Sequence, residues 1–128
     1  MDDQPPRAST PRRPRRGRLS RSAEFERAYR QGRSHGNRHF VVYAFARETG
    51  GEEKRLGLSV SRKVGGATER NRVKRLVREA FAAESEALPA RHDVVVVARP
   101  GARELAEREG LAGFRDSLRE LFERVGRS

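Results

Sequence analysis

The chain contains no cysteine, no tryptophan and a single methionine among its 128 residues. The lack of cysteine excludes a disulfide framework and a thiolate-ligated metal site. No uninterrupted run of roughly 18 apolar residues occurs, so the sequence offers no helix that could cross a membrane. The N-terminus is charged and has no apolar segment of the kind found in secretory signals. We therefore expect a cytoplasmic protein that has no membrane partner and folds without disulfides.

Acidic residues are scarce relative to basic ones, because 18 Asp+Glu stand against 29 Lys+Arg and the formal net charge is +11. Such an excess favours nucleic acid as a partner over an anionic membrane. The charge is also unevenly distributed, since residues 62–78 contain seven basic residues and only Glu69 as an acid. More than half of the net charge thus lies in one short segment. A contact surface for a polyanion explains this clustering better than a solubility function does.

Residues 1–18, MDDQPPRASTPRRPRRGR, are rich in proline and arginine and nearly free of large apolar side chains. A segment of this composition cannot bury enough surface to offset the entropy cost of ordering. We expect a disordered basic tail over residues 1–18. The remaining residues, 19–128, are expected to form one domain, which suits the length of the chain.

The hydrophobic pattern beyond the tail predicts an α+β fold with the order α-β-β-α-β-α and helices packed on a small sheet. The first two strands are expected to pair as a hairpin. The second helix is expected to begin near Thr68 as its N-cap, and the run DVVVVA predicts a strand that is central in the sheet or buried on both faces. The expected helices cover residues 19–32, 69–87 and 111–125, and the expected strands cover residues 39–46, 55–61 and 93–98.

The helix expected over residues 69–87 is apolar on one side and basic on the other. At about 100° per residue, Val73, Leu76, Val77 and Ala80 share one face, with Phe81 at its border. The opposite face is predicted to be a continuous basic surface, and Arg62 and Lys63 extend it from the preceding strand. A solvated face is the plain alternative for any basic helix. The residues of this surface are Arg62, Lys63, Arg70, Asn71, Arg72, Lys74, Arg75 and Arg78.

Phe25 and Tyr29 are spaced to share a face of the first helix, and this spacing by itself favours packing in the core. Tyr43 fits a half-buried strand position equally well. No phosphate-binding loop occurs, and His35 and His39 lie four residues apart with no cysteine or obvious acid to complete a metal site. We therefore expect no catalytic residue and no metal ligand in the chain.

Several segments together resemble the protein subunit of bacterial ribonuclease P. The most specific is RNRVKRLVREAF following LGLSVSRKVGGA. LSRSAEFERAYRQGR is similar to the first helix of that family and GNRHFVVYAF to its first strand. RHDVVVVARPGA resembles its later strand and turn, and FRDSLRELFERV its terminal helix. The resemblance covers roughly residues 18–125, in the same order.

The resemblance implies a subunit of an endoribonuclease whose catalyst is an RNA. In this family the RNA uses bound Mg²⁺ to hydrolyse the phosphodiester before the mature 5′ end of tRNA. The protein binds the catalytic RNA and the 5′ leader of precursor tRNA, and no small-molecule substrate is involved. The family fold also contains a left-handed β-α-β crossover, which would join strand 55–61 to strand 93–98. The resemblance implies that the basic surface contacts the catalytic RNA. It places Arg18, Phe25, Tyr29 and Tyr43 at the cleft that receives the leader.

Two other functions are compatible with a basic domain of this size. One is a non-catalytic RNA-binding protein of the ribosomal or chaperone type. The other is a helix-turn-helix DNA regulator that reads DNA with helix 69–87. The strands on both sides of that helix, and the lack of a helix directly before it, count against the DNA regulator. The family resemblance separates the leading interpretation from both.

Overall fold

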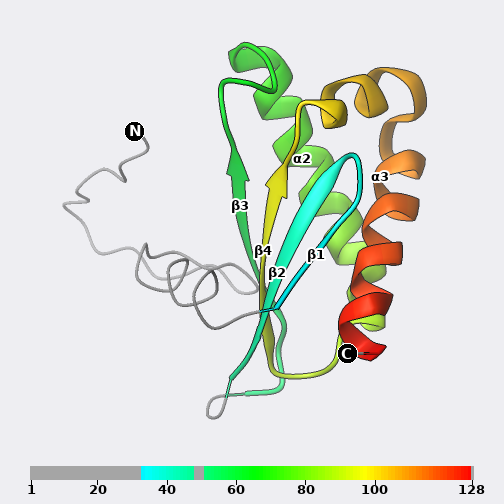
Figure 1. Ribbon diagram of the computed structural model, residues 1–128. Helices are drawn as coiled ribbons and strands as arrows, with labels where there is room; N and C mark the ends of the chain where they lie inside the picture. The colour runs from blue at the N-terminus through cyan, green and yellow to red at the C-terminus, as the bar shows by residue number, and fades with distance from the viewer. Residues whose placement is uncertain (1–32, 48–50, 128) are drawn as a thin grey trace, which may run out of the picture.

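A four-stranded mixed sheet with two helices on one face forms the fold, and the computed structural model describes residues 33–47 and 51–127 (Figure 1). The α+β class predicted from the sequence is confirmed. The strands lie in the order β1-β2-β4-β3. The elements are β1 (Arg33–Gly36), β2 (Phe40–Ala46), β3 (Arg55–Val60), α2 (Ala67–Glu84), the 3₁₀ turn η1 (Ser85–Ala87), β4 (His92–Ala98) and α3 (Gly101–Arg127).

The expected hairpin between residues 39–46 and 55–61 is wrong, because β4 lies between the two strands. β4 pairs antiparallel with β2 and parallel with β3. Val94, Val95 and Val96 of β4 are fully buried, which confirms the prediction of a central strand. A run that is apolar on both faces needs a neighbour on each side, and β2 and β3 take those places.

β2 instead forms its hairpin with β1, a short polar strand that the hydrophobic pattern did not reveal. The turn between them depends on Asn37. Its Oδ1 accepts the backbone N–H groups of His39 at 2.9 Å and Phe40 at 3.0 Å. Its Nδ2 donates to Ser117 Oγ of α3 at 3.0 Å. One asparagine therefore shapes the turn and attaches it to the terminal helix.

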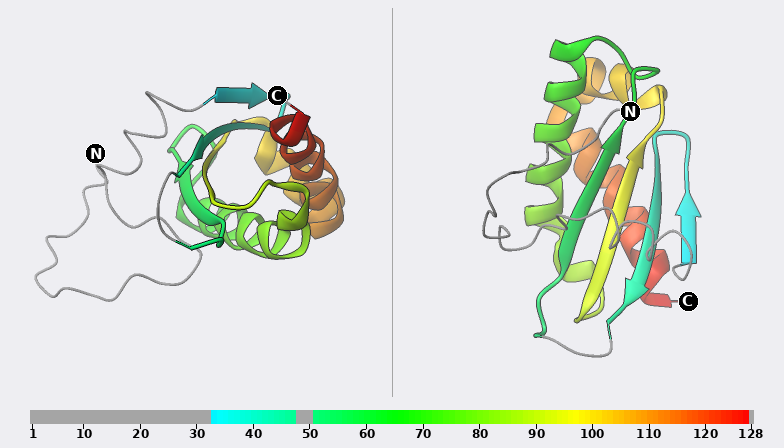
Figure 2. Two further views of the ribbon diagram at one scale, coloured as in Figure 1. Left: turned by 90° about the horizontal axis from the view of Figure 1, so that it is seen from below. Right: turned by 90° about the vertical axis from the view of Figure 1, so that its left-hand side faces the viewer.

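The connection from β3 through α2 to β4 is left-handed. In Figure 1 the sheet lies in front of the helices, β3 stands to the left of β4, and both strands run upward. The chain leaves the upper end of β3, descends behind the sheet in α2 and returns upward in β4. Figure 2 shows α2 and α3 on the same side of the sheet. This hand departs from the right-handed rule that most such connections obey, and it agrees with what the family resemblance implies.

The core lies between the helices and one face of the sheet. The α2 residues Val73, Leu76, Val77 and Ala80 are buried, as their helical spacing predicted. α3 adds four large side chains, and its Phe114 packs edge-on against Phe40 of β2 with ring centroids 5.1 Å apart. The α3 residues are Phe114, Leu118, Leu121 and Phe122, and each is fully buried.

The start of α2 differs from the sequence prediction. Thr68 is not the N-cap, because the helix already begins at Ala67 and Gly66 occupies the capping position. Glu69 Oε1 accepts the backbone N–H of Gly66 at 2.8 Å. Glu69 therefore supplies the reciprocal half of a capping box, and its carboxylate also lies at the positive end of the helix dipole.

α3 is longer than the helix expected over residues 111–125 and is kinked. Gly110 has φ 60° and ψ −142°, which no other residue type adopts without strain. This break interrupts the apolar periodicity, and that is why residues 101–109 were not predicted as helix. No described helix has the length and apolar character that a membrane span would require. The predicted tail 1–18 and the predicted helix 19–32 lie outside the described residues.

Candidate nucleic-acid interface

The exposed face of α2 brings together the predicted basic surface. Asn71, Arg72 and Arg75 are exposed, whereas Arg70, Lys74 and Arg78 are half-buried. Arg62 and Lys63 are exposed in the connection between β3 and α2. This connection leads directly into α2, so it lies at the same end of the sheet as the N-terminal half of that helix. Seven of the eight residues of the basic surface therefore lie at this end of the sheet, and Arg78 follows further along α2.

Most cations of this surface have no acidic partner among residues 33–47 and 51–127. Lys74 and Arg78 make no ion pair or side-chain hydrogen bond with any residue that the structure describes. Arg75 approaches Glu79 only to 3.9 Å. Arg70 Nε is buried without a hydrogen-bond partner. Like charges at i,i+4 spacing repel each other, so this arrangement costs free energy until an anionic partner neutralises it.

Arg72 is the exception in the basic surface. Its Nη2 donates to the backbone carbonyl of Ala106 at 3.0 Å, in the last turn of α3 before the kink at Gly110. Nearby, Arg103 of α3 lies 3.8 Å from Glu69 of α2. The N-terminal half of α2 is thus attached to the N-terminal half of α3. Arg72 contributes to the fold as well as to the charge of the surface, which its position on the helical wheel did not indicate.

The second face of the sheet, which faces away from α2 and α3, has its own apolar cluster. Val95 of β4 is fully buried there, with Tyr43, Phe45 and Val97 packed against it. Tyr43 is half-buried and alternates along β2 with Val42 and Ala44, which pack in the core. Of the four residues predicted for the leader cleft, only Tyr43 belongs to the described residues. Arg18, Phe25 and Tyr29 lie outside the described residues.

A buried ionic cluster at one end of the second face was missed by the sequence analysis. Asp93 is 5% exposed and bonds two arginines. Arg47 Nη1 donates to its Oδ1 at 2.7 Å, and Arg55 donates through Nε at 2.9 Å and Nη2 at 2.8 Å. The register aligns Phe45, Asp93 and Arg55 across three strands. The sequence did contain a signal for this cluster, because Asp93 directly precedes the run of valines in β4. A carboxylate in such a buried strand is rarely found without a basic partner.

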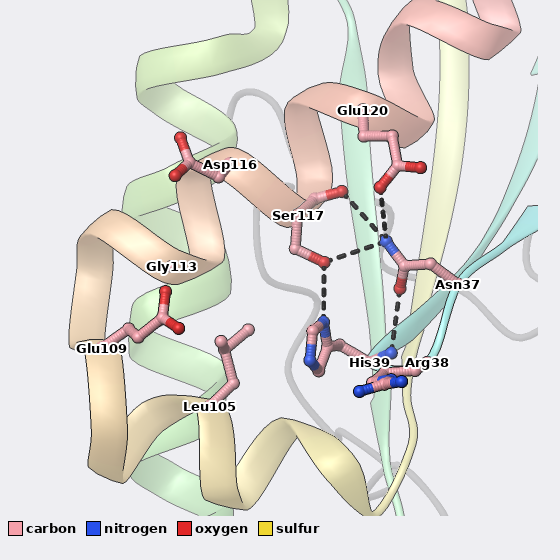
Figure 3. A pocket seen from close by; sticks show the side chains of 9 residues that line it. All are labelled: Asn37, Arg38, His39, Leu105, Glu109, Gly113, Asp116, Ser117 and Glu120. Atoms are coloured by element: carbon pink, nitrogen blue, oxygen red, sulfur yellow. Dashed lines mark hydrogen bonds between the residues drawn. The ribbon is translucent and has the colours of Figure 1, made fainter.

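A pocket of about 380 Å³ lies between the β1–β2 turn and α3 (Figure 3). Three carboxylates line it, from Glu109, Asp116 and Glu120. His39 Nδ1 lies 3.2 Å from Ser117 Oγ at its base. Burial lowers the pKa of His39 below its usual range, and the charges of Arg38 and Arg108 lower it further. The carboxylates repel phosphate, so this pocket does not extend the basic surface.

No set of three or more His, Cys, Asp or Glu side chains in residues 33–47 and 51–127 is arranged to hold a metal ion. His35 and His39 separate in the fold. His35 lies in β1 beside Arg124, and His39 lies in the turn beside Ser117. His92 begins β4, and its Nδ1 is 3.1 Å from the carbonyl oxygen of Ala90.

Comparison with known proteins gives one consistent result. Residues 14–126 match the family model described as Ribonuclease P. The ribonuclease P protein component of Bacillus pumilus is 42% identical over 107 residues, which is 84% of this chain and 86% of the relative. That of Desulfovibrio desulfuricans is 45% identical over 93 residues, which is 73% of this chain and 72% of the relative.

Solved structures show the same similarity. The RNase P protein of Thermotoga maritima superimposes with a TM-score of 0.75 at 36% identity, covering 85% of this chain and 97% of that one. The RNase P protein of Staphylococcus aureus, solved at 2.0 angstrom, gives a TM-score of 0.74 at 34% identity, covering 86% of this chain and 95% of that one. The residues matched by the family model, 14–126, include all described strands, α2, the basic surface and all but the last residue of α3.

Proposed function

Because the chain belongs to the family of ribonuclease P protein components, we propose that it binds the RNA subunit of that ribonucleoprotein through the basic surface. The observation that carries this proposal is the set of α2 cations without a counter-charge in the described fold. We further propose that the protein assists removal of the 5′ leader from precursor tRNA in the cytoplasm. Family membership favours this function over the ribosomal or chaperone alternative.

The side chains of the basic surface suit a structured RNA backbone. The planar guanidinium of an arginine can donate two parallel hydrogen bonds to one phosphate, and a lysine ammonium acts as a point charge. Asn71 can donate and accept, so it suits a ribose hydroxyl or a base edge. Binding releases the counterions condensed on the RNA, and the affinity is therefore expected to fall steeply with salt.

The second face of the sheet suits single-stranded RNA. An aromatic ring stacks on any base, because every base has a π-face, and each such contact contributes roughly 1–3 kcal/mol. Tyr43 is the described residue that we assign to this role. Phe25 and Tyr29 would complete the stacking surface, and Arg18 would contact a phosphate. In this proposal, α2 binds the RNA subunit and the second face of the sheet binds the leader.

We assign hydrolysis to the RNA subunit, and Mg²⁺ to sites held mainly by that RNA. The carboxylates and histidines of the described residues do not form a set that fits the ion. The protein's own contribution is to bind, to orient the leader and to reduce the repulsion between two RNA molecules.

The proposal is tested by reconstitution with a bacterial ribonuclease P RNA at low Mg²⁺. Cleavage of precursor tRNA is measured with RNA alone, protein alone and both together. We expect the combination to cleave faster than RNA alone and the purified protein alone to be inactive. A protein that never improves cleavage would leave only a general RNA-binding function, and cleavage by RNA-free protein would refute an RNA catalyst.

The leader assignment has its own test in Tyr43→Ala, with Tyr43→Phe as the matched control that keeps the ring. The ratio of holoenzyme affinities for precursor and mature tRNA is measured. Loss of one stacked base at roughly 1–3 kcal/mol lowers that ratio about 5-fold to 150-fold. An unchanged ratio in folded Tyr43→Ala protein would show that the ring does not stack on the leader.

A further inference from the structure

Two arginines outside the basic surface lie at the same end of the sheet as Arg62 and Lys63. The register aligns Val60 of β3 with Ala98 of β4 and Ala98 with Phe40 of β2. Arg99 follows β4 directly, Arg62 follows β3 by two residues, and Arg38 precedes β2 by two. Neighbouring strands are about 4.8 Å apart. The three arginines therefore follow one another across the end of the sheet, from β3 through β4 to β2.

These cations also lack acidic partners in the part of the chain that the structure describes. Arg38, Arg62, Lys63 and Arg99 are exposed, and none makes an ion pair with a described residue. Arg99 Nη1 donates to the carbonyl of Asn37 at 3.0 Å, which fixes its guanidinium beside the β1–β2 turn. Arg38 borders the acidic pocket, but Figure 3 shows its guanidinium apart from the three carboxylates.

The topology adds positive potential at this end of the sheet. β3 and β4 run parallel, and each is followed after a short connection by a helix, α2 or α3. Both helices therefore present their N-terminal ends here. A helix N-terminus has a partial positive charge of roughly half a unit, which adds to the side-chain charges. Glu69 offsets part of this effect at α2.

We propose that Arg38 and Arg99 extend the basic surface into a basic rim, formed by Arg38, Arg62, Lys63 and Arg99, that binds an RNA phosphodiester backbone across the end of the sheet. The inference rests on the proposed function and adds two residues to its RNA contacts. The backbone belongs either to the RNA subunit or to precursor tRNA. Both present the same phosphate chemistry, and the experiment distinguishes them.

The test is the double variant Arg38→Gln with Arg99→Gln in the full-length protein. Affinity is measured over a range of salt concentrations, first for a bacterial ribonuclease P RNA and then, as holoenzyme, for precursor and mature tRNA. Arg115→Gln with Arg119→Gln is the matched control, because it removes two α3 charges that already have acidic partners, Glu84 and Asp116. Lys74→Gln with Arg78→Gln is the positive control on α2.

We expect the rim variant to make the slope of log affinity against log salt shallower by about 1 to 2 units in one of the two assays. A change with the ribonuclease P RNA identifies the backbone as that of the RNA subunit. A change confined to the tRNA assays identifies it as that of the substrate. The α3 control is expected to leave both slopes unchanged.

The rim is refuted if its variant matches the α3 control in both assays while the α2 variant changes the slope. If the α2 variant also leaves the slope unchanged, the proposed function itself fails. The single variant Arg38→Gln tests whether a slope change could come from altered folding, because Arg38 makes no side-chain hydrogen bond or ion pair with a described residue. It is expected to give about half of the slope change with the same thermal unfolding midpoint.

Discussion

The exposed faces of α2 and α3 are both rich in arginine, but several α3 arginines have a close acidic partner, whereas most α2 cations have none among the described residues. Arg115 lies 2.7 Å from Glu84, Arg119 lies 2.6 Å from Asp116, and Arg124 lies 3.0 Å from Glu120. Among the described residues, the one ion pair made by a basic residue of α2 joins Arg75 to Glu79 and spans 3.9 Å. The arginines of α3 are therefore largely paired, with Glu84 of α2 as one of the partners, whereas the cations of α2 are largely unpaired and form the surface that we propose for RNA.

The difference shows why residue counts alone do not locate a binding surface. An exposed ion pair contributes about 0–1 kcal/mol, so the pairs Arg119–Asp116 and Arg124–Glu120 are not expected to determine the stability of the fold. Their effect is to remove α3 from competition for RNA. The α2 cations repel one another in the free protein, and this unfavourable term disappears on binding.

The largest expected effect follows from reversing charge on α2 with Lys74→Glu and Arg78→Glu. Both side chains lack counter-charges among the described residues, so the substitutions are expected to weaken RNA binding without breaking an ion pair in the protein. We expect affinity for ribonuclease P RNA to fall on the order of 100-fold at moderate salt. Filter binding or fluorescence anisotropy measures it, with Arg115→Ala and Arg119→Ala as the α3 comparison. Equal losses for both pairs would abolish the distinction between the helices.

A smaller effect is expected at the kink of α3. Gly110→Ala forces a side chain into a backbone conformation at φ 60°, although the added methyl group itself meets no atom within 4 Å. We expect the free energy of unfolding to fall by about 1–3 kcal/mol through backbone strain. Chemical denaturation measures it. Gly126→Ala is the control, because Gly126 lies in the same helix without a positive φ, and it is expected to be neutral or stabilising. Equal effects would remove the case for strain.

Within α2, Arg72→Ala and Arg75→Ala distinguish a residue that binds RNA and also stabilises the fold, Arg72, from one that only binds RNA, Arg75. Each loss is expected to make the salt slope of RNA binding shallower by about one unit, and the double variant by up to about two. Only Arg72→Ala also loses the bond to Ala106, which lowers the free energy of unfolding by about 0.5–1.5 kcal/mol. Slopes that match wild type in both single variants would contradict the phosphate assignment. Equal unfolding energies would show that the Ala106 contact contributes nothing.

The smallest expected effect is a dependence of the protein's stability on pH, caused by His35 and His39. Burial, with nearby arginines, lowers the pKa of both His35 and His39 below the ordinary value of 6.5. The unfolded chain therefore takes up protons first, and stability is expected to decrease as pH falls through about 6.5 towards the folded-state pKa values. Thermal unfolding at pH 5.5 and 7.5, with His39→Asn as comparison, measures this. A midpoint that rises on acidification would reverse the assigned sign.

The elements whose pattern is local were predictable from the sequence. The buried stripe of α2 follows from the spacing of Val73, Leu76, Val77 and Ala80, and the central place of β4 follows from its valines. The pairing of β2 was not predictable from its own residues. A hairpin with β3 would have needed the shortest connection. β4, which lies much further along the chain, instead pairs with the edge of β2 that β3 would have occupied. The short strand β1 has no apolar alternation and was missed for that reason.

The candidate site divides in the same way. The eight residues of the basic surface were identified from charge and helical spacing, because both are properties of a continuous segment. The ion pairs of Asp93 join three strands, and the bond from Arg72 to Ala106 joins two helices. No local pattern predicts such contacts, since they depend on which residues meet after folding.

By itself, the sequence determined the basic face of α2, the buried centre of the sheet and the family. The tertiary structure alone decided which arginines stay without partners and which cations share one end of the sheet. The reason is physical. Periodicity fixes the direction of a side chain on its own element, whereas a partner on another element, such as Glu84 for Arg115, is set by the packing of the whole core.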